Sequence, residues 1–95
     1  SALRGEDRAG GDAVEIVTLY FAALRDKVGL DRETISLPED VRTIADLAAW
    51  LETNRPSLRG HVAKARFAVG EEFVEGARAL RRGDVVALIP PVSGG

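Results

Sequence analysis

Apolar residues recur along this chain with two different periods, and each period predicts a different kind of element. Residues 14–21 (Val-Glu-Ile-Val-Thr-Leu-Tyr-Phe) are rich in β-branched and aromatic side chains, which suit a β-strand. Residues 22–28 predict a short helix that ends at Gly29, since glycine readily takes the left-handed conformation of a helix stop. Residues 33–37 alternate polar and apolar before Pro38, which predicts a second strand antiparallel to the first.

The clearest helix is predicted over residues 43–54. Its apolar positions follow the i, i+3, i+4, i+7 spacing of one helix face, namely Ile44, Leu47, Ala48 and Leu51. Thr43 and Asp46 have the spacing of a capping box at its start, and Pro56 follows its end. We expect residues 58–62 to form a single irregular turn.

Strands return in the last third of the chain. Residues 65–69 and 72–74 flank Gly70-Glu71, a plausible hairpin turn, and Gly83-Asp84 predicts another turn. Residues 85–89 are apolar throughout, which is typical of a central strand covered on both faces. This order of elements predicts an α+β fold, a roll in which a mixed sheet packs on one main helix.

The first and last strands are apolar on both of their faces. Val17, Leu19 and Phe21 oppose Ile16 and Tyr20 in the first, and Val85, Ala87 and Ile89 oppose Val86 and Leu88 in the last. One helix covers only one face of a small sheet, so the second apolar face predicts a partner-binding surface. The alternative, that residues 58–62 cover this face, stays open.

Composition narrows the classes of function. The chain has 95 residues, 13 basic and 15 acidic side chains, and a formal charge of −2, which favours neither nucleic acid nor an anionic membrane as a partner. It has no cysteine, which is compatible with the cytoplasm. Residues 1–12 are polar and glycine-rich and predict a disordered tail ahead of one domain over residues 13–95.

No autonomous active site is evident among the side chains. His61 is the only histidine, and neither a catalytic triad nor a metal-ligand spacing surrounds it, so no metal is expected. Glu71 and Glu72 fall at a predicted hairpin tip, where solvated carboxylates are the usual case. Trp50 lies beside the apolar stripe of the main helix, and partial burial is its expected role.

The chain ends on Pro90-Pro91-Val92-Ser93-Gly94-Gly95. The two prolines cannot donate to a sheet ladder, so the segment leaves the fold there as a flexible tail. Gly94 and Gly95 give the thinnest cross-section that a polypeptide has, which suits a tail that threads a narrow tunnel and presents its terminal carbonyl.

Three stretches of the sequence carry a family resemblance. They are Phe-Ala-Ala-Leu-Arg-Asp-Lys-Val-Gly (21–29), Ala-Val (68–69), and the run from Leu80 through Gly-Asp (83–84) and the last strand to Gly95. The chain resembles the small subunits of molybdopterin synthase, which are β-grasp, ubiquitin-like sulfur carriers of the MoaD/ThiS group. Gly70 stands where the family often has Asn, and both residues suit a turn with positive φ.

The resemblance implies a role as a sulfur carrier that is not an enzyme on its own. An activating enzyme that uses ATP-Mg would adenylate the carboxylate of Gly95, and a sulfur donor would convert it to a thiocarboxylate. The tail would then enter a pocket on the large subunit and pass sulfur to a cyclic pterin precursor of the molybdenum cofactor. The chain itself would bind no cofactor.

The resemblance also implies a partner surface and an assembly. By family position, Phe21, Phe73 and Ile89 are the candidates for the apolar patch that docks the large subunit, in a heterotetramer. Two alternatives stay open: a carrier for thiamine or for tRNA thiolation, and a ubiquitin-like modifier that forms isopeptide bonds with lysines. Thiamine carriers are usually shorter and lack the helix at residues 22–29, which favours the pterin pathway.

Overall fold

The computed structural model describes residues 14–91. The expected N-terminal tail (1–12) and the last four residues (92–95) lie outside the described part of the chain. In chain order the elements are β2 (Val14–Tyr20), α1 (Ala22–Val28), β3 (Arg32–Leu37), α2 (Ile44–Asn54), the 3₁₀ turns η1 (Pro56–Leu58) and η2 (Val62–Lys64), β4 (Arg66–Val69), β5 (Glu72–Val74) and β6 (Val85–Ile89).

Five strands form one mixed sheet in the order β3-β2-β6-β4-β5. β2 and β6 run parallel at its centre, and the other neighbouring strands are antiparallel. The all-apolar strand β6 therefore lies between β2 and β4, which confirms the central position that its composition predicted. Because β2 and β6 are parallel, both finish at the same end of the sheet.

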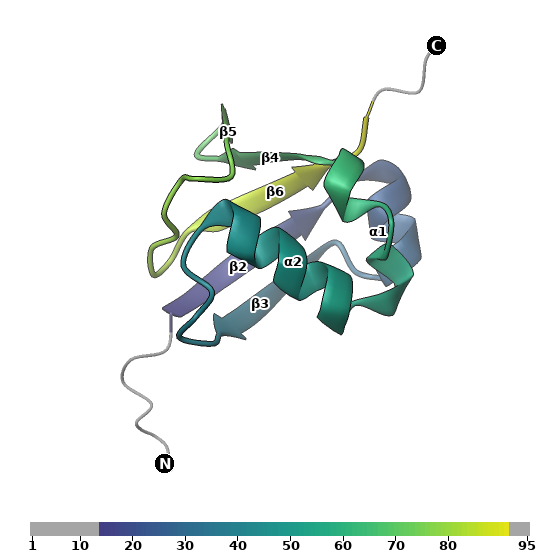
Figure 1. The fold of residues 1–95 in the computed structure, drawn as a ribbon. Helices are drawn as coiled ribbons and strands as arrows, with labels where there is room; N and C mark the ends of the chain where they lie inside the picture. Colours follow the sequence, from purple (N-terminus) through teal and green to yellow (C-terminus); the bar gives the residue numbers. More distant parts are fainter. Residues whose placement is uncertain (1–13, 92–95) are drawn as a thin grey trace.

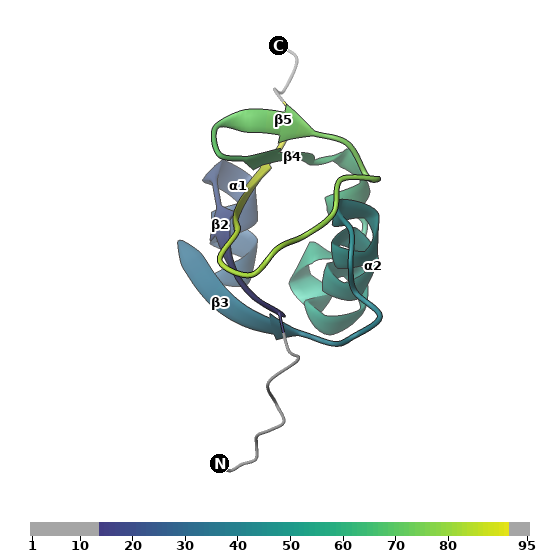
Figure 2. The same ribbon diagram turned by 90° about the vertical axis from the view of Figure 1, so that its left-hand side faces the viewer.

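Helix α2 lies across one face of this sheet, called the inner face below (Figures 1 and 2). Its start confirms the predicted capping box: Thr43 Oγ1 accepts a hydrogen bond from Asp46 N, and Asp46 Oδ2 accepts one from Thr43 N, both at 3.2 Å. Ile44, Leu47 and Leu51 on its apolar stripe are buried against the sheet. The α+β roll on one main helix is confirmed.

Helix α1 lies at the end of the sheet where β2 and β6 finish (Figure 1). Phe21 is its N-cap and has extended backbone, so the first strand ends at Tyr20, one residue earlier than predicted. Gly29 ends the helix with φ at +84°, and its N–H donates to the carbonyl of Arg25 at 2.8 Å, which confirms the predicted left-handed stop.

The segment after α2 differs from the single irregular turn that the sequence predicted. Two 3₁₀ turns, η1 and η2, place Leu58 and Val62 in the core, where both side chains are almost completely buried. Both turns contact α2, and η1 also contacts α1. The segment thus completes the inner core, and the alternative that it covers the outer face of the sheet is wrong.

Candidate functional site

Strand β6 carries two sets of side chains, one for each face of the sheet. Val86 and Leu88 point to the inner face and are fully buried. Val85, Ala87 and Ile89 alternate with them and line the outer face, where Val85 remains 42% exposed. The two-sided character predicted for this strand is confirmed, and its second face is open to solvent.

The outer face is hollowed into an apolar groove of about 360 Å³. We call it the outer groove. Its lining residues are Leu19, Phe21, Ala68, Gly70, Glu71, Phe73, Val85, Ala87 and Ile89. They come from β2, β4, β5 and β6 and from the start of α1, so segments that are far apart in the sequence build one surface.

The depth of the outer groove follows from the strand register. Leu19, Ala87, Ala68 and Phe73 form one continuous row of paired residues across β2, β6, β4 and β5. The two alanines at the centre of this row are small, whereas the residues at its ends are large. The row therefore has a low floor between two walls, a shape that receives an apolar side chain from another protein.

The three residues predicted to bind the partner, Phe21, Phe73 and Ile89, all line this groove. Phe73 is 54% exposed and Phe21 is 44% exposed, and both are large apolar side chains that stand in solvent. Ile89 is half-buried and directly precedes Pro90. Phe21 and Ile89 lie at the end of the sheet where the last strand finishes, and Phe73 lies in the row of Ala87, two residues before that end.

On the same face, β3 is polar. Arg32, Thr34 and Ser36 alternate with its buried residues and are exposed. The outer face is thus divided into a polar half at β3 and an apolar half from β2 to β5. Sequence reasoning placed the β2 and β6 residues in the apolar half but missed Ala68, because an alanine in a short strand carries no signal of its face until its register is known.

A tight turn anchors the start of β6. Gly83 has φ at +84°, and its N–H donates to the carbonyl of Glu15 at 2.8 Å. The Asp84 carboxylate accepts hydrogen bonds from Arg81 N at 2.8 Å and from Arg78 Nη1 at 2.5 Å. The Gly-Asp pair thus makes the predicted turn and fixes β6 against β2, which sets where the strand ends.

The end of β6 is set by proline. Pro90 is half-buried and Pro91 is exposed, and neither has an N–H for the sheet ladder. The remaining predicted tail residues (Val92, Ser93, Gly94 and Gly95) lie outside the described residues.

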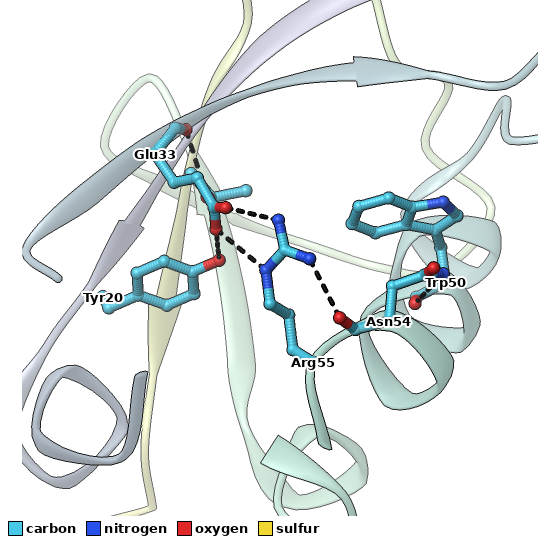
Figure 3. Close-up of polar contacts among 6 residues, drawn as sticks. Tyr20, Glu33, Trp50, Asn54 and Arg55 are labelled. Atoms are coloured by element: carbon cyan, nitrogen blue, oxygen red, sulfur yellow. Dashed lines mark hydrogen bonds and ion pairs between the residues drawn. The ribbon is translucent and has the colours of Figure 1, made fainter. Parts of the chain in front are cut away.

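A polar cluster ties the inner side of the sheet to the end of α2 (Figure 3). The Tyr20 hydroxyl donates to Glu33 Oε1 at 2.8 Å, and Arg55 Nε donates to the same oxygen at 3.1 Å. Arg55 Nη2 also pairs with Glu33 Oε2, and the guanidinium lies 5.1 Å from the centroid of the Trp50 ring. Trp50 is half-buried, as predicted.

The environment of this cluster shifts three pKa values, and the hydrogen bond to Glu33 raises the pKa of Arg55. Burial raises the pKa of Tyr20 to about 12, and the neighbouring Glu33 carboxylate also raises it. Burial alone would raise the pKa of Glu33, but hydrogen bonds from Arg55 and Tyr20 outweigh it and hold that pKa below its ordinary value. The cluster lies on the inner side, away from the outer groove, and its role is to stabilise the fold.

The described residues show no metal site. Within residues 14–91, no group of three or more His, Cys, Asp or Glu side chains is placed to hold a metal ion. His61 is half-buried at the start of η2. No helix between residues 14 and 91 is long and apolar enough to cross a bilayer.

The fold and the site define a class of protein. A β-grasp sheet on one helix, with an apolar groove beside the exit of its last strand, is the architecture of a ubiquitin-like carrier. The model of the ThiS family matches residues 18–95, and the chain belongs to this family.

Named relatives agree with this assignment. The chain is 37% identical over 84 residues to the molybdopterin synthase sulfur carrier subunit of Homo sapiens, a match that covers 85% of this chain and 94% of the human protein. It is also similar to a putative molybdopterin converting factor, subunit 1, of Pyrococcus furiosus, with 31% identity, a TM-score of 0.72, and coverage of 83% of this chain and 99% of that one.

Two further solved structures share the fold. SAMP1 from Haloferax volcanii matches with a TM-score of 0.72 and 26% identity, covering 85% of this chain and 99% of that chain. A complex of subunits 1 and 2 of the molybdopterin-converting factor from Helicobacter pylori contains a chain with a TM-score of 0.63 and 20% identity, with coverage of 86% and 100%. At that identity the second likeness concerns the fold alone.

Proposed function

We propose that this chain is the sulfur carrier subunit of a molybdopterin synthase. Its similarity to curated sulfur carrier subunits over most of its length supports this function. The structural observation that carries the proposal is the outer groove, which ends at Ile89, the residue from which the tail departs. A partner that docks on the groove receives the tail at the edge of the same contact.

The proposed chemistry takes place on the terminal carboxylate of Gly95. A carboxylate is a poor electrophile, so one of its oxygens first attacks the α-phosphorus of ATP and pyrophosphate leaves. A hydrosulfide-level sulfur nucleophile (HS⁻) then attacks the acyl carbon, AMP leaves with the bridging oxygen, and loss of the S–H proton gives the thiocarboxylate. Glycine at positions 94 and 95 presents no Cβ to obstruct these attacks. The thiocarboxylate sulfur finally attacks a carbon of a cyclic pterin precursor and displaces an oxygen substituent, and water then hydrolyses the resulting thioester, which leaves the sulfur on the pterin and restores the Gly95 carboxylate.

In this proposal the body of the chain binds and orients, and the catalytic side chains belong to its partners. Phe21, Phe73 and Ile89 dock the large subunit in a heterotetramer, and the activating enzyme supplies ATP-Mg. The Helicobacter pylori complex, which joins a subunit 1 of this fold to a subunit 2, supports a large-subunit partner. The chain binds no cofactor of its own, and it acts in the cytoplasm.

A second candidate function is a ubiquitin-like protein modifier. The likeness to SAMP1 favours it, since a related Haloferax volcanii structure is described as a small archaeal modifier protein. Both functions activate the same carboxylate, but a modifier passes its acyl group to a lysine amine, whereas a carrier passes sulfur and keeps its acyl group. The product therefore separates them.

Intact mass spectrometry tests the carrier chemistry. The full chain is incubated with the cognate activating enzyme, ATP and a sulfur donor, and we expect the mass gain of one oxygen-to-sulfur exchange. A variant that lacks Gly95 is the control and should gain no mass while its thermal stability is unchanged. A gain in that variant, or no gain in the full chain, refutes the proposal; conjugates to lysine would establish the modifier function instead.

Titration calorimetry with the large subunit tests the docking surface separately. Phe73→Asp replaces one apolar wall of the outer groove by a carboxylate and should weaken binding at least about tenfold without unfolding the domain, because the apolar ring is lost and a charged group must be desolvated on association. Thr34→Asp makes a comparable change on the polar half of the same face and should leave the affinity unchanged. Equal affinities for the two variants would remove Phe73 from the interface.

A further inference from the structure

One charged side chain covers part of the apolar half of the outer face. Arg66 is exposed, and its guanidinium carbon lies 3.9 Å from the centroid of the Phe73 ring. Arg66 is the first residue of β4 and pairs with Ile89 of β6, while Phe73 pairs with Ala68, two residues further along β4. The stack is therefore a diagonal cross-strand contact on the outer face.

The position of Arg66 puts it inside the footprint of any partner that uses the groove. Ile89, its neighbour on one side, precedes the tail, and Phe73, on the other side, forms one wall of the groove. A partner that receives the tail and also buries Phe73 spans both points. Its surface must then also cover the guanidinium that lies between them.

Burying this guanidinium in an interface is unfavourable unless the partner supplies a counter-charge. Other arginines of the described chain have carboxylate partners: Arg55 pairs with Glu33, Arg78 with Asp84, and Arg25 with Asp31. Among residues 14–91, the Arg66 guanidinium has the Phe73 ring as a neighbour but makes no hydrogen bond or ion pair. A cation that loses its water without gaining a counter-charge is strongly disfavoured, so an apolar surface alone would not bind here.

We propose that Arg66 determines partner specificity: the large subunit presents a carboxylate to its guanidinium, with the Phe73 ring as the platform beneath. This inference rests on the docking surface proposed above. The guanidinium carbon lies 3.9 Å from the ring centroid, and the guanidinium N–H groups of Arg66 make no hydrogen bond within residues 14–91, so they can donate two parallel hydrogen bonds to one carboxylate. Because the stack already restricts the side chain, less rotamer entropy is lost on binding.

The same stack has a simpler explanation, in which Arg66 only shields an exposed ring from water. The two explanations predict opposite results for Arg66→Leu. Arg66→Leu enlarges the apolar surface and removes the charge. If Arg66 is only a shield that a partner must displace, the variant should therefore bind equally well or more tightly. If the large subunit offers a carboxylate, the same change leaves that carboxylate unpaired in the interface, and binding weakens.

The experiment is titration calorimetry of the full chain against the cognate large subunit at two salt concentrations. We expect Arg66→Leu to weaken binding about 10- to 100-fold and Arg66→Glu to weaken it further, since two carboxylates then face each other. Arg66→Lys should recover only part of the loss, because an ammonium cannot form the planar two-bond pair. Arg66→Leu should also reduce the salt dependence of the affinity.

Arg32 provides the matched control. It is also an exposed arginine on the outer face and the first residue of its strand, and it pairs with Leu19 at the boundary between the polar half and the outer groove. Arg32→Leu and Arg32→Glu should change the affinity little, and urea unfolding should show every variant folded. If Arg66→Leu binds as tightly as the parent while Phe73→Asp does not, the proposed carboxylate on the large subunit is refuted, and the outer groove remains the proposed docking surface. If Phe73→Asp also binds normally, the docking surface itself is wrong.

Discussion

On the inner face of the sheet, large side chains of β2 and β6 meet α2 and the 3₁₀ turns and are almost fully buried, as Ile16, Tyr20 and Leu88 show. On the outer face, residues one step along the same strands end in solvent, with Phe21 and Val85 both more than 40% exposed. The same strands thus carry two apolar surfaces, one satisfied within the chain and one not. A monomer gains most of its stability from the first, and an exposed apolar surface such as the second is typical of a partner-binding site.

Two arginines repeat this contrast. Arg55 lies over Trp50 and also pairs with Glu33, so its charge and its hydrogen bonds are matched by this chain (Figure 3). Arg66 lies over Phe73, and the described chain offers it no carboxylate. The first arrangement is complete in the free protein, whereas the second has the aromatic platform but not the anion. The difference separates the face that holds the fold from the face that, in our proposal, meets another molecule.

Neighbouring residues of β6 give the largest expected difference between the faces. Leu88→Ala removes a fully buried side chain and should lower the free energy of unfolding by about 2–5 kcal/mol. Ile89→Ala acts on the half-buried outer side and should cost about 1 kcal/mol. It should instead weaken binding to the large subunit. Urea denaturation and calorimetry check this, and equal losses of stability would contradict the division into two faces.

Much of the fold was predictable because its signals are local. The capping box at Thr43 and Asp46, the glycine stop at Gly29 and the alternation in β6 each depend on residues close in sequence, and all three were confirmed. The presence of two apolar faces on β2 and β6 was visible for the same reason. The strand order, by contrast, depends on pairings between distant segments.

What the sequence did not reveal depends on register. Arg55 and Glu33 are 22 positions apart, and no local pattern joins them. The stack of Arg66 on Phe73 likewise requires knowing which residues of β4 and β5 are paired. The two turns at Leu58 and Val62 were not predicted correctly, because two isolated apolar residues in a polar segment resemble a surface loop. Only the structure shows that both side chains are buried under α2.

The Glu33 cluster allows a smaller and pH-dependent test of the inner side. Glu33→Gln keeps an acceptor oxygen but removes the charge that faces Arg55, and it should lower the free energy of unfolding by about 1–3 kcal/mol at pH 7. The pKa of Glu33 is lower in the folded state than in the unfolded state, so its stabilising contribution is fully present above the unfolded pKa. It is lost as the pH falls through the folded pKa.

The stability difference between the parent and Glu33→Gln should therefore shrink on acidification. Urea titrations at several pH values below neutrality measure it. Glu39→Gln, at an exposed site, is the control for the substitution itself and should change the free energy of unfolding little at pH 7. A parent–variant gap that stays constant into strong acid would mean that the carboxylate charge of Glu33 does not stabilise the fold.

The smallest expected effect lies at the hairpin between β4 and β5, on the rim of the outer groove. Glu71 has φ at +70°, in the left-handed region that disfavours residues with a Cβ, and it follows Gly70 at +60°. Glu71→Gly should raise the free energy of unfolding by about 0.5 kcal/mol, since the relief of strain exceeds the added freedom of the unfolded chain. Glu72→Gly removes the same charge from β5 and should lower it by about 0.5–1 kcal/mol. Thermal unfolding of both variants tests whether the two changes in stability have opposite signs. A loss of stability in both variants would mean that contacts of the Glu71 side chain on the outer face outweigh the strain of its backbone.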